Sequence, residues 1–114
     1  MGLGIKEQAY WSTYGAITAT GTTTLISPTG SDCVYLCYGV INVRGATTGE
    51  TIDLCAASST TIIWSVDATA NNVGNHGLIF GEKGWRATSG AALYLVVDAT
   101  HDVTFAFTGY TDKG

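Results

Sequence analysis

The stretch Cys33–Gly45, CVYLCYGVINVRG, decides the fold class because it is apolar on both faces of a strand. At the two-residue period of a β-strand, one face carries Cys33, Tyr35, Cys37, Gly39, Ile41 and Val43. The other face carries Val34, Leu36, Tyr38 and Val40, and it turns polar only at Asn42. A strand with one solvated face alternates apolar and polar residues, so this pattern predicts a strand that is covered on both sides.

The composition around this stretch is that of a single β-domain. The chain has 114 residues, 46% of them hydrophobic and only 12% charged, with one proline. The charged share is about half of the ordinary value of roughly 25%, and the length suffices for one core. A net charge of −4 with five scattered Lys and Arg residues provides no basic surface for nucleic acid. No apolar run reaches the roughly 18 residues of a membrane span.

The rest of the chain consists of short β-like segments separated by turn residues, without helical periodicity. Strands are expected at 16–20, 22–27, 33–44, 51–56, 60–67, 78–80, 84–88, 91–98 and 102–110. Their alternation predicts a core that includes Ile52, Leu54, Ala56, Ile62, Trp64, Val66, Leu93, Leu95, Val97, Val103, Phe105 and Phe107. Such spacing predicts an all-β fold, a single-domain antiparallel β-sandwich or jelly roll of about eight strands over residues 16–114.

Residues 1–15 lie outside this pattern and are expected to form an N-terminal arm. Tyr10, Trp11 and Tyr14 place three aromatic side chains within five positions of it. Large apolar groups on a mobile segment suit an anchor that docks into a neighbouring protein. The alternative is local: the cluster closes an open edge of the domain's own sandwich.

The cysteines favour a structural role in a protein made in a cytoplasm. Cys33, Cys37 and Cys55 are odd in number and lack CxxC spacing, and the N-terminus lacks a secretory signal. We expect three buried, reduced thiols. A Cys37–Cys55 disulfide is the alternative, and it would need an oxidising compartment.

The other polar residues predict no enzyme, no metal and no cofactor. His76 and His101 fall in expected surface loops, without a nucleophile pattern beside either. The Asn-rich loop 67–77 gathers donors that could bind Ca²⁺ or a sugar, but Asn and Gly are also the default residues of tight turns. Trp85 follows a turn and precedes Arg86, where it could form an exposed platform for carbohydrate.

A pattern of strands and glycines over residues 18–110 carries a family resemblance. It includes a G-W-x-A-x-x-G-x-x-L-x-L segment, formed by Gly84, Trp85, Ala87, Gly90, Leu93 and Leu95. The order resembles small structural proteins of tailed bacteriophages. The resemblance implies a β-sandwich protein of the virion surface, above all a capsid decoration (cement) protein. Such proteins commonly sit as trimers on the major capsid protein. A tail or fibre-associated protein is the other implied role.

Assembly would explain the second apolar face, because an interface between copies or with a shell covers what a free monomer exposes. The residues expected at such an interface are Tyr10, Trp11, Tyr14, Leu36, Tyr38, Val40, Trp85, Arg86 and Tyr94. The competing explanation is a sandwich whose own arm or long loop covers that strand. The competing function is a carbohydrate- or receptor-binding module that uses Trp85 and the loop 67–77.

Overall fold

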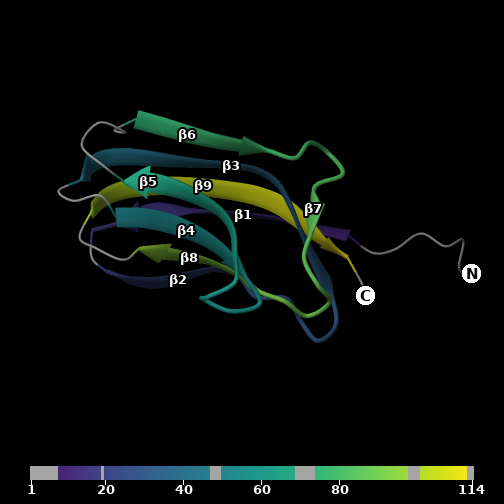
Figure 1. Ribbon diagram of the computed structural model, residues 1–114. Coiled ribbons are helices and arrows are strands. Elements are labelled where there is room, and N and C mark those ends of the chain that lie inside the picture. Colours follow the sequence, from purple (N-terminus) through teal and green to yellow (C-terminus); the bar gives the residue numbers. More distant parts are fainter. Residues whose placement is uncertain (1–7, 19, 47–49, 69–73, 98–100, 113–114) are drawn as a thin grey trace, which may run out of the picture.

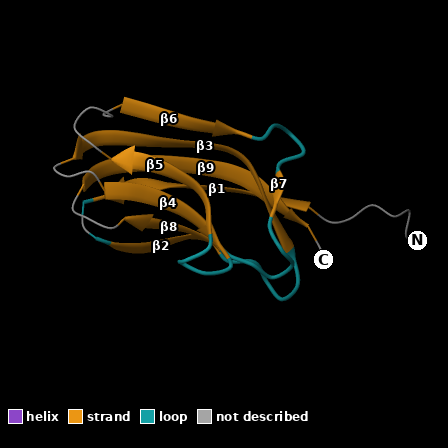
Figure 2. Ribbon diagram, in the orientation of Figure 1, coloured by secondary structure: helices purple, strands orange, loops and turns teal. Residues whose placement is uncertain are grey.

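The protein is a two-layered β-sandwich in a computed structural model, which describes residues 8–18, 20–46, 50–68, 74–97 and 101–112. Figure 1 shows the two layers, and Figure 2 shows strands and connecting loops without a helix in these residues. The strands there are β1 (Gln8–Ile17), β2 (Gly21–Ile26), β3 (Cys33–Ala46), β4 (Glu50–Ala56), β5 (Ile62–Ala68), β6 (Gly74–Ile79), β7 (Trp85–Arg86), β8 (Leu93–Val97) and β9 (His101–Asp112).

The strands form two antiparallel sheets. Sheet A has the order β1-β9-β3-β6, and the short β7 pairs with β3 beyond the end of β6. Sheet B has the order β2-β8-β4-β5. The eight long strands thus pass between the layers in the order of a jelly roll, which confirms the predicted fold class.

The core lies between the two sheets and is filled by the alternating residues of the central strands. In β8 and β9 the sequence alternation is reproduced, because Leu93, Leu95, Val97, Val103 and Phe107 are all buried. In β4, Ile52, Leu54 and Ala56 face this core as predicted. Asp53 and Cys55 on the opposite face of β4 are also buried, and the Asp53 carboxylate accepts a hydrogen bond of 2.8 Å from Ser65 Oγ.

A β-bulge in β3 explains why this strand has apolar residues on both faces of a regular two-residue repeat. Leu36 pairs with Gly109 and Tyr38 pairs with Thr108, so Cys37 is an extra residue in β3. An extra residue reverses which face the following side chains occupy. Val34 and Leu36 therefore face the core before the bulge, and Ile41 and Val43 face it afterwards. The unbroken period of two that was expected for this strand is therefore wrong at Cys37.

Two glycines lie beneath the large rings of β9. Gly39 of β3 pairs with Phe107, and a Cβ added there would lie 2.4 Å from Phe107 Cδ1. Gly15 of β1 pairs with Phe105, and its added Cβ would lie 3.2 Å from Phe105 Cζ. The missing side chains leave the space that the two aromatic rings fill in the core.

Residues 8–15 do not belong to a separate arm. They form most of β1, which pairs with β9 along its whole length from Gln8↔Asp112 to Ile17↔Val103. The expected strand at 16–20 is only the end of β1. The prediction for residues 1–7 lies outside the described residues.

A second bulge moves Ile62 out of the predicted core. The register between β4 and β5 shifts between Leu54 and Cys55, where Cys55 pairs with Ile62 and Leu54 with Trp64. Ile62 is therefore exposed, whereas Trp64 and Val66 pack on the core.

Candidate functional site: the outer face of sheet A

Four of the six large exposed apolar side chains among the described residues gather on one surface; the other two are Ile62 and Phe80. Tyr10, Tyr14, Tyr38 and Ile79 lie on the outer face of sheet A, the face that points away from sheet B. Strand register places them there: Tyr38 pairs with Ile79 of β6 on one side and with Thr108 of β9 on the other. On the described part of sheet B, Ile62 is the one large apolar side chain that is similarly exposed.

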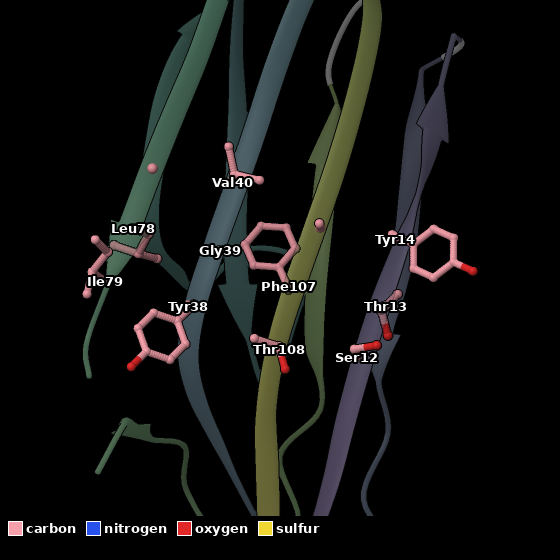
Figure 3. Close-up of a pocket in the computed structure, with 12 residues that line it drawn as sticks. Ser12, Thr13, Tyr14, Tyr38, Gly39, Val40, Leu78, Ile79, Phe107 and Thr108 are labelled. Carbon is pink, nitrogen blue, oxygen red and sulfur yellow. The ribbon is translucent and has the colours of Figure 1, made fainter. Parts of the chain in front are cut away.

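A shallow hollow of about 380 Å³ lies in the middle of this outer face. Figure 3 shows Tyr14 of β1 and Tyr38 of β3 on opposite sides of it, with Ile79 of β6 beyond Tyr38. None of its lining residues is charged; they are Ser12, Thr13, Tyr14, Tyr38, Gly39, Val40, Gly77, Leu78, Ile79, Ala106, Phe107 and Thr108. The small residues of β9 and β6 leave the space that the tyrosine rings border.

A row of aromatic rings crosses the same face toward β7. Tyr35 and Tyr110 stack with ring centroids 4.5 Å apart and an interplanar angle of 8°. Tyr10 meets Tyr110 edge-on at 6.2 Å. Tyr35 also pairs with Arg86, whose Nη2 donates to Cys33 Sγ at 3.1 Å. The row ties β1, β9, β3 and β7 together by neighbouring side chains.

Burial and neighbouring groups raise the pKa of three side chains at this face, Tyr110, Cys37 and Arg86. Burial, with the nearby Tyr35 as a further cause, raises the pKa of Tyr110, whose hydroxyl donates to the Lys83 carbonyl at 2.8 Å. Burial also raises the pKa of the Cys37 thiol. Cys33 and then Tyr35 raise the pKa of Arg86, which keeps this guanidinium charged. None of these shifts creates a nucleophile or an acid that would titrate near neutral pH.

The residues that were expected at an interface do not all lie on one surface. Tyr10, Tyr14, Tyr38 and Val40 share the outer face of sheet A, where Val40 is half-buried. Arg86 is exposed at the β7 end of that face.

The other four expected residues lie elsewhere. Leu36 is fully buried in the core, so its assignment to an interface was wrong. Trp11 and Trp85 are half-buried against the core, and the Trp11 Nε1–H is buried without a partner among the described residues. Tyr94 is half-buried on sheet B.

Sequence reasoning missed Ile79 and the small residues of the hollow. Ile79 was placed in a short strand at 78–80, but β6 begins at Gly74 and therefore takes in part of the loop expected at 67–77. Ser12, Ala106 and Thr108 carry no signal of their own. The one signal for the hollow was the alternation in DVTFAFTGY, which puts the small Ala106 and Thr108 on the face opposite to that of the two phenylalanines.

The described residues contain no group of three or more His, Cys, Asp or Glu side chains that could hold a metal ion. Cys33, Cys37 and Cys55 are all buried with free thiols. His76 and His101 were both expected in loops, but His76 lies in β6 and His101 is the first residue of β9. Within the same residues, no helix is long and apolar enough to cross a membrane.

Comparison with known proteins finds similarity in fold. No family model and no curated protein matches the chain. A chain in the acid-stable capsid structure of Helicobacter pylori bacteriophage KHP30 matches with a TM-score of 0.59 and 15% identity, over 96% of this chain and 94% of that one. A chain of the cyanophage Pam1 capsid asymmetric unit matches with a TM-score of 0.52 and 13% identity, over 96% and 86%.

A third match comes from Bacillus endospore appendages, described as a family of disulfide-linked pili. Its TM-score is 0.57 with 13% identity, over 96% of this chain and 91% of that one. At these identities the matches show a common fold.

Proposed function

We propose that the chain is a virion structural protein, a capsid decoration (cement) protein that binds the outer shell of a phage as a homo-oligomer, with a trimer favoured. Its partner in this role is the major capsid protein, and its place is the capsid surface. The proposed role is not enzymatic. The resemblance in sequence pattern and the fold similarity to chains in two phage capsid structures both support it.

The observation that carries the proposal is the uncharged, tyrosine-bordered hollow on the outer face of sheet A. Apolar patches of this kind on soluble proteins usually mark sites of association. Interfaces are enriched in aromatic residues, and their centres are depleted of charge. Tyr14, Tyr38 and Ile79 have this character, and no charged residue lines the hollow among them. We therefore place the shell contact on this face.

A carbohydrate- or receptor-binding module is the second candidate, and one observation favours it. The hollow has a volume within the range of small-ligand sites, and Tyr14 and Tyr38 border it with exposed rings. Trp85 no longer contributes to this candidate, because it packs on the core. Of the loop 67–77, residues 69–73 lie outside the described residues.

Binding to shells tests the proposal. Purified protein is mixed with undecorated shells of the major capsid protein of the same phage, and the bound fraction is measured by co-sedimentation. Tyr38→Glu places a charge in the contact face and should weaken binding at least tenfold, about 1.4 kcal/mol. Tyr94→Glu is the matched control on sheet B and should bind like the wild type.

Two outcomes would overturn the shell-binding proposal. One is wild-type protein that fails to bind shells, and the other is equal binding by Tyr38→Glu and wild type. Saturable binding of neutral oligosaccharides that Tyr14→Ala and Tyr38→Ala abolish, without shell binding, would establish the second candidate instead. Thermal unfolding of each variant checks that the fold is intact.

A further inference from the structure

We propose that sheet A continues from one copy of this protein into the next, through antiparallel pairing of β6 of one copy with β1 of its neighbour. The inference deepens the homo-oligomer in the proposed function by naming the surfaces that join the copies. It rests on three properties of β1 and β6, which together with the two-residue β7 form the edges of the sheet.

The first property is strand direction. Successive strands along β1-β9-β3-β6 are antiparallel, so β6 runs opposite to β1. Two copies placed side by side in the same orientation therefore bring β6 of one copy next to an oppositely directed β1 of the other. The new ladder would repeat the hydrogen-bond pattern that already joins the strands inside the sheet.

The second property is the lack of protection along β1 and β6 themselves; the exposed Arg86 lies on the same side of β3 as β6, but on the short β7. Edge strands of monomeric proteins usually carry charges, proline or bulges that prevent pairing with another chain. The ten residues of β1, QAYWSTYGAI, and the six of β6, GNHGLI, contain no charged residue and no proline. The edges of sheet B differ: β5 carries Asp67, and β2 is interrupted by a register shift between Thr24 and Ile26.

The third property is where the exposed apolar surface lies. Tyr10 and Tyr14 on β1 are 83% and 81% exposed, and Ile79 on β6 is 78% exposed. Tyr38 on the central β3 is only 42% exposed. All four side chains share the outer face, so a β6–β1 junction would set Ile79 of one copy beside Tyr10 and Tyr14 of the next. Figure 3 shows Ile79 and Tyr14 at opposite sides of this face within one copy. Aromatic and β-branched side chains stabilise each other across neighbouring strands.

A junction between two different edges is heterologous, which constrains the assembly. Repetition closes a ring where the rotation between copies allows it, and otherwise produces a filament. A trimer would be the three-membered ring of such junctions. Every copy would use both edges once, and no β1 or β6 would be left exposed.

The test uses the full chain in solution and places a charge at each edge separately. The mass of wild type, Ile79→Glu and Tyr14→Glu is measured by light scattering from micromolar to millimolar concentration. Wild type should form oligomers, and each variant should associate at least tenfold more weakly. Thr24→Glu, on the exposed outer face of β2, is the matched control and should assemble like wild type.

Mixing the two variants tests the heterologous geometry. The Ile79→Glu chain keeps an intact β1, and the Tyr14→Glu chain keeps an intact β6. The mixture should therefore form one-to-one dimers and nothing larger, because only one good junction exists between them. Pairing between two β1 strands would instead leave Ile79→Glu fully assembled, and that result would overturn the inference.

Ala106→Glu separates this inference from the proposed function. Ala106 lies on the outer face of sheet A but on the inner strand β9. Edge pairing predicts that this variant self-assembles normally while its shell binding falls. Loss of self-assembly in Ala106→Glu would mean that copies pack face to face, and wild-type protein that stays monomeric at millimolar concentration would also overturn the inference.

Discussion

At the scale of single residues, the clearest constraint is at position 39, where the ring of Phe107 leaves no room for a side chain. Gly39→Ala should destabilise the protein by about 2 kcal/mol, because the added methyl overlaps the buried ring of Phe107. Gly77→Ala on the neighbouring β6 is the matched control, since its added Cβ meets only the Gly39 carbonyl at 4.0 Å. That control should stay within about 0.5 kcal/mol of wild type. Denaturant unfolding measures both, and equal stability of the two variants would contradict the packing described.

The buried thiol of Cys37 links stability to alkaline pH. Its folded-state pKa is raised above 9.0 by burial, so the unfolded chain loses this proton first as the pH rises. The stabilisation is therefore complete below about pH 9 and is lost as the pH passes through the folded-state value. Tyr110, whose pKa is also raised, acts in the same direction.

We expect the melting temperature of wild type to fall as the pH rises from about 9 to about 11. In Cys37→Ala the fall should be smaller, although Tyr110 still contributes. Scanning calorimetry across this range measures both slopes. Identical slopes in the two proteins would show that the thiol contributes nothing.

At the scale of elements, β1 decides which truncations are informative. Deleting residues 1–7 leaves all ten residues of β1 in place and serves as the length control. Deleting residues 1–14 removes Trp11 from the core and uncovers the edge of β9. This longer deletion should lower the free energy of unfolding by on the order of 3 kcal/mol or more. Calorimetry compares the two deletions, and a long deletion that melts at the same temperature as the short one would contradict the pairing of β1 with β9.

The sequence predicted the elements wherever alternation was regular. In β8 and β9 a period of two identified the buried residues, because no bulge interrupts either strand's own alternation. In β3 and β5 the bulges at Cys37 and near Ile62 reversed or shifted the faces. A bulge depends on how the neighbouring strand fits, so a rule applied to one strand at a time cannot locate it.

At the scale of the whole molecule, both sheets share one core and should unfold together. Leu95 of sheet B and Phe107 of sheet A belong to the same buried cluster, and Trp11 and Trp64 pack on it from opposite sheets. Unfolding followed by tryptophan fluorescence and by far-ultraviolet circular dichroism should therefore give coincident transitions. The Trp64→Phe variant, which reports mainly on sheet A, should give the same coincidence. Two separate transitions would mean that the layers are independent.

The candidate site was only partly predictable because it depends on strand order. Tyr10, Tyr14 and Tyr38 were identified as aromatic residues without a core position, and they are exposed as expected. Ile79 joins them only because β6 lies beside β3, and these strands are far apart in the chain. Leu36 was misplaced by the bulge that follows it.

The extra residue at Cys37 also has a consequence for comparing sequences. A relative with a regular strand at this point would lack one residue, and every apolar position before it would shift by one relative to those after it. Alignments of such relatives need a one-residue gap between Leu36 and Tyr38. Without that gap, core positions of one protein would be matched to surface positions of the other, and the shared ancestry of the two sequences would look weaker than it is.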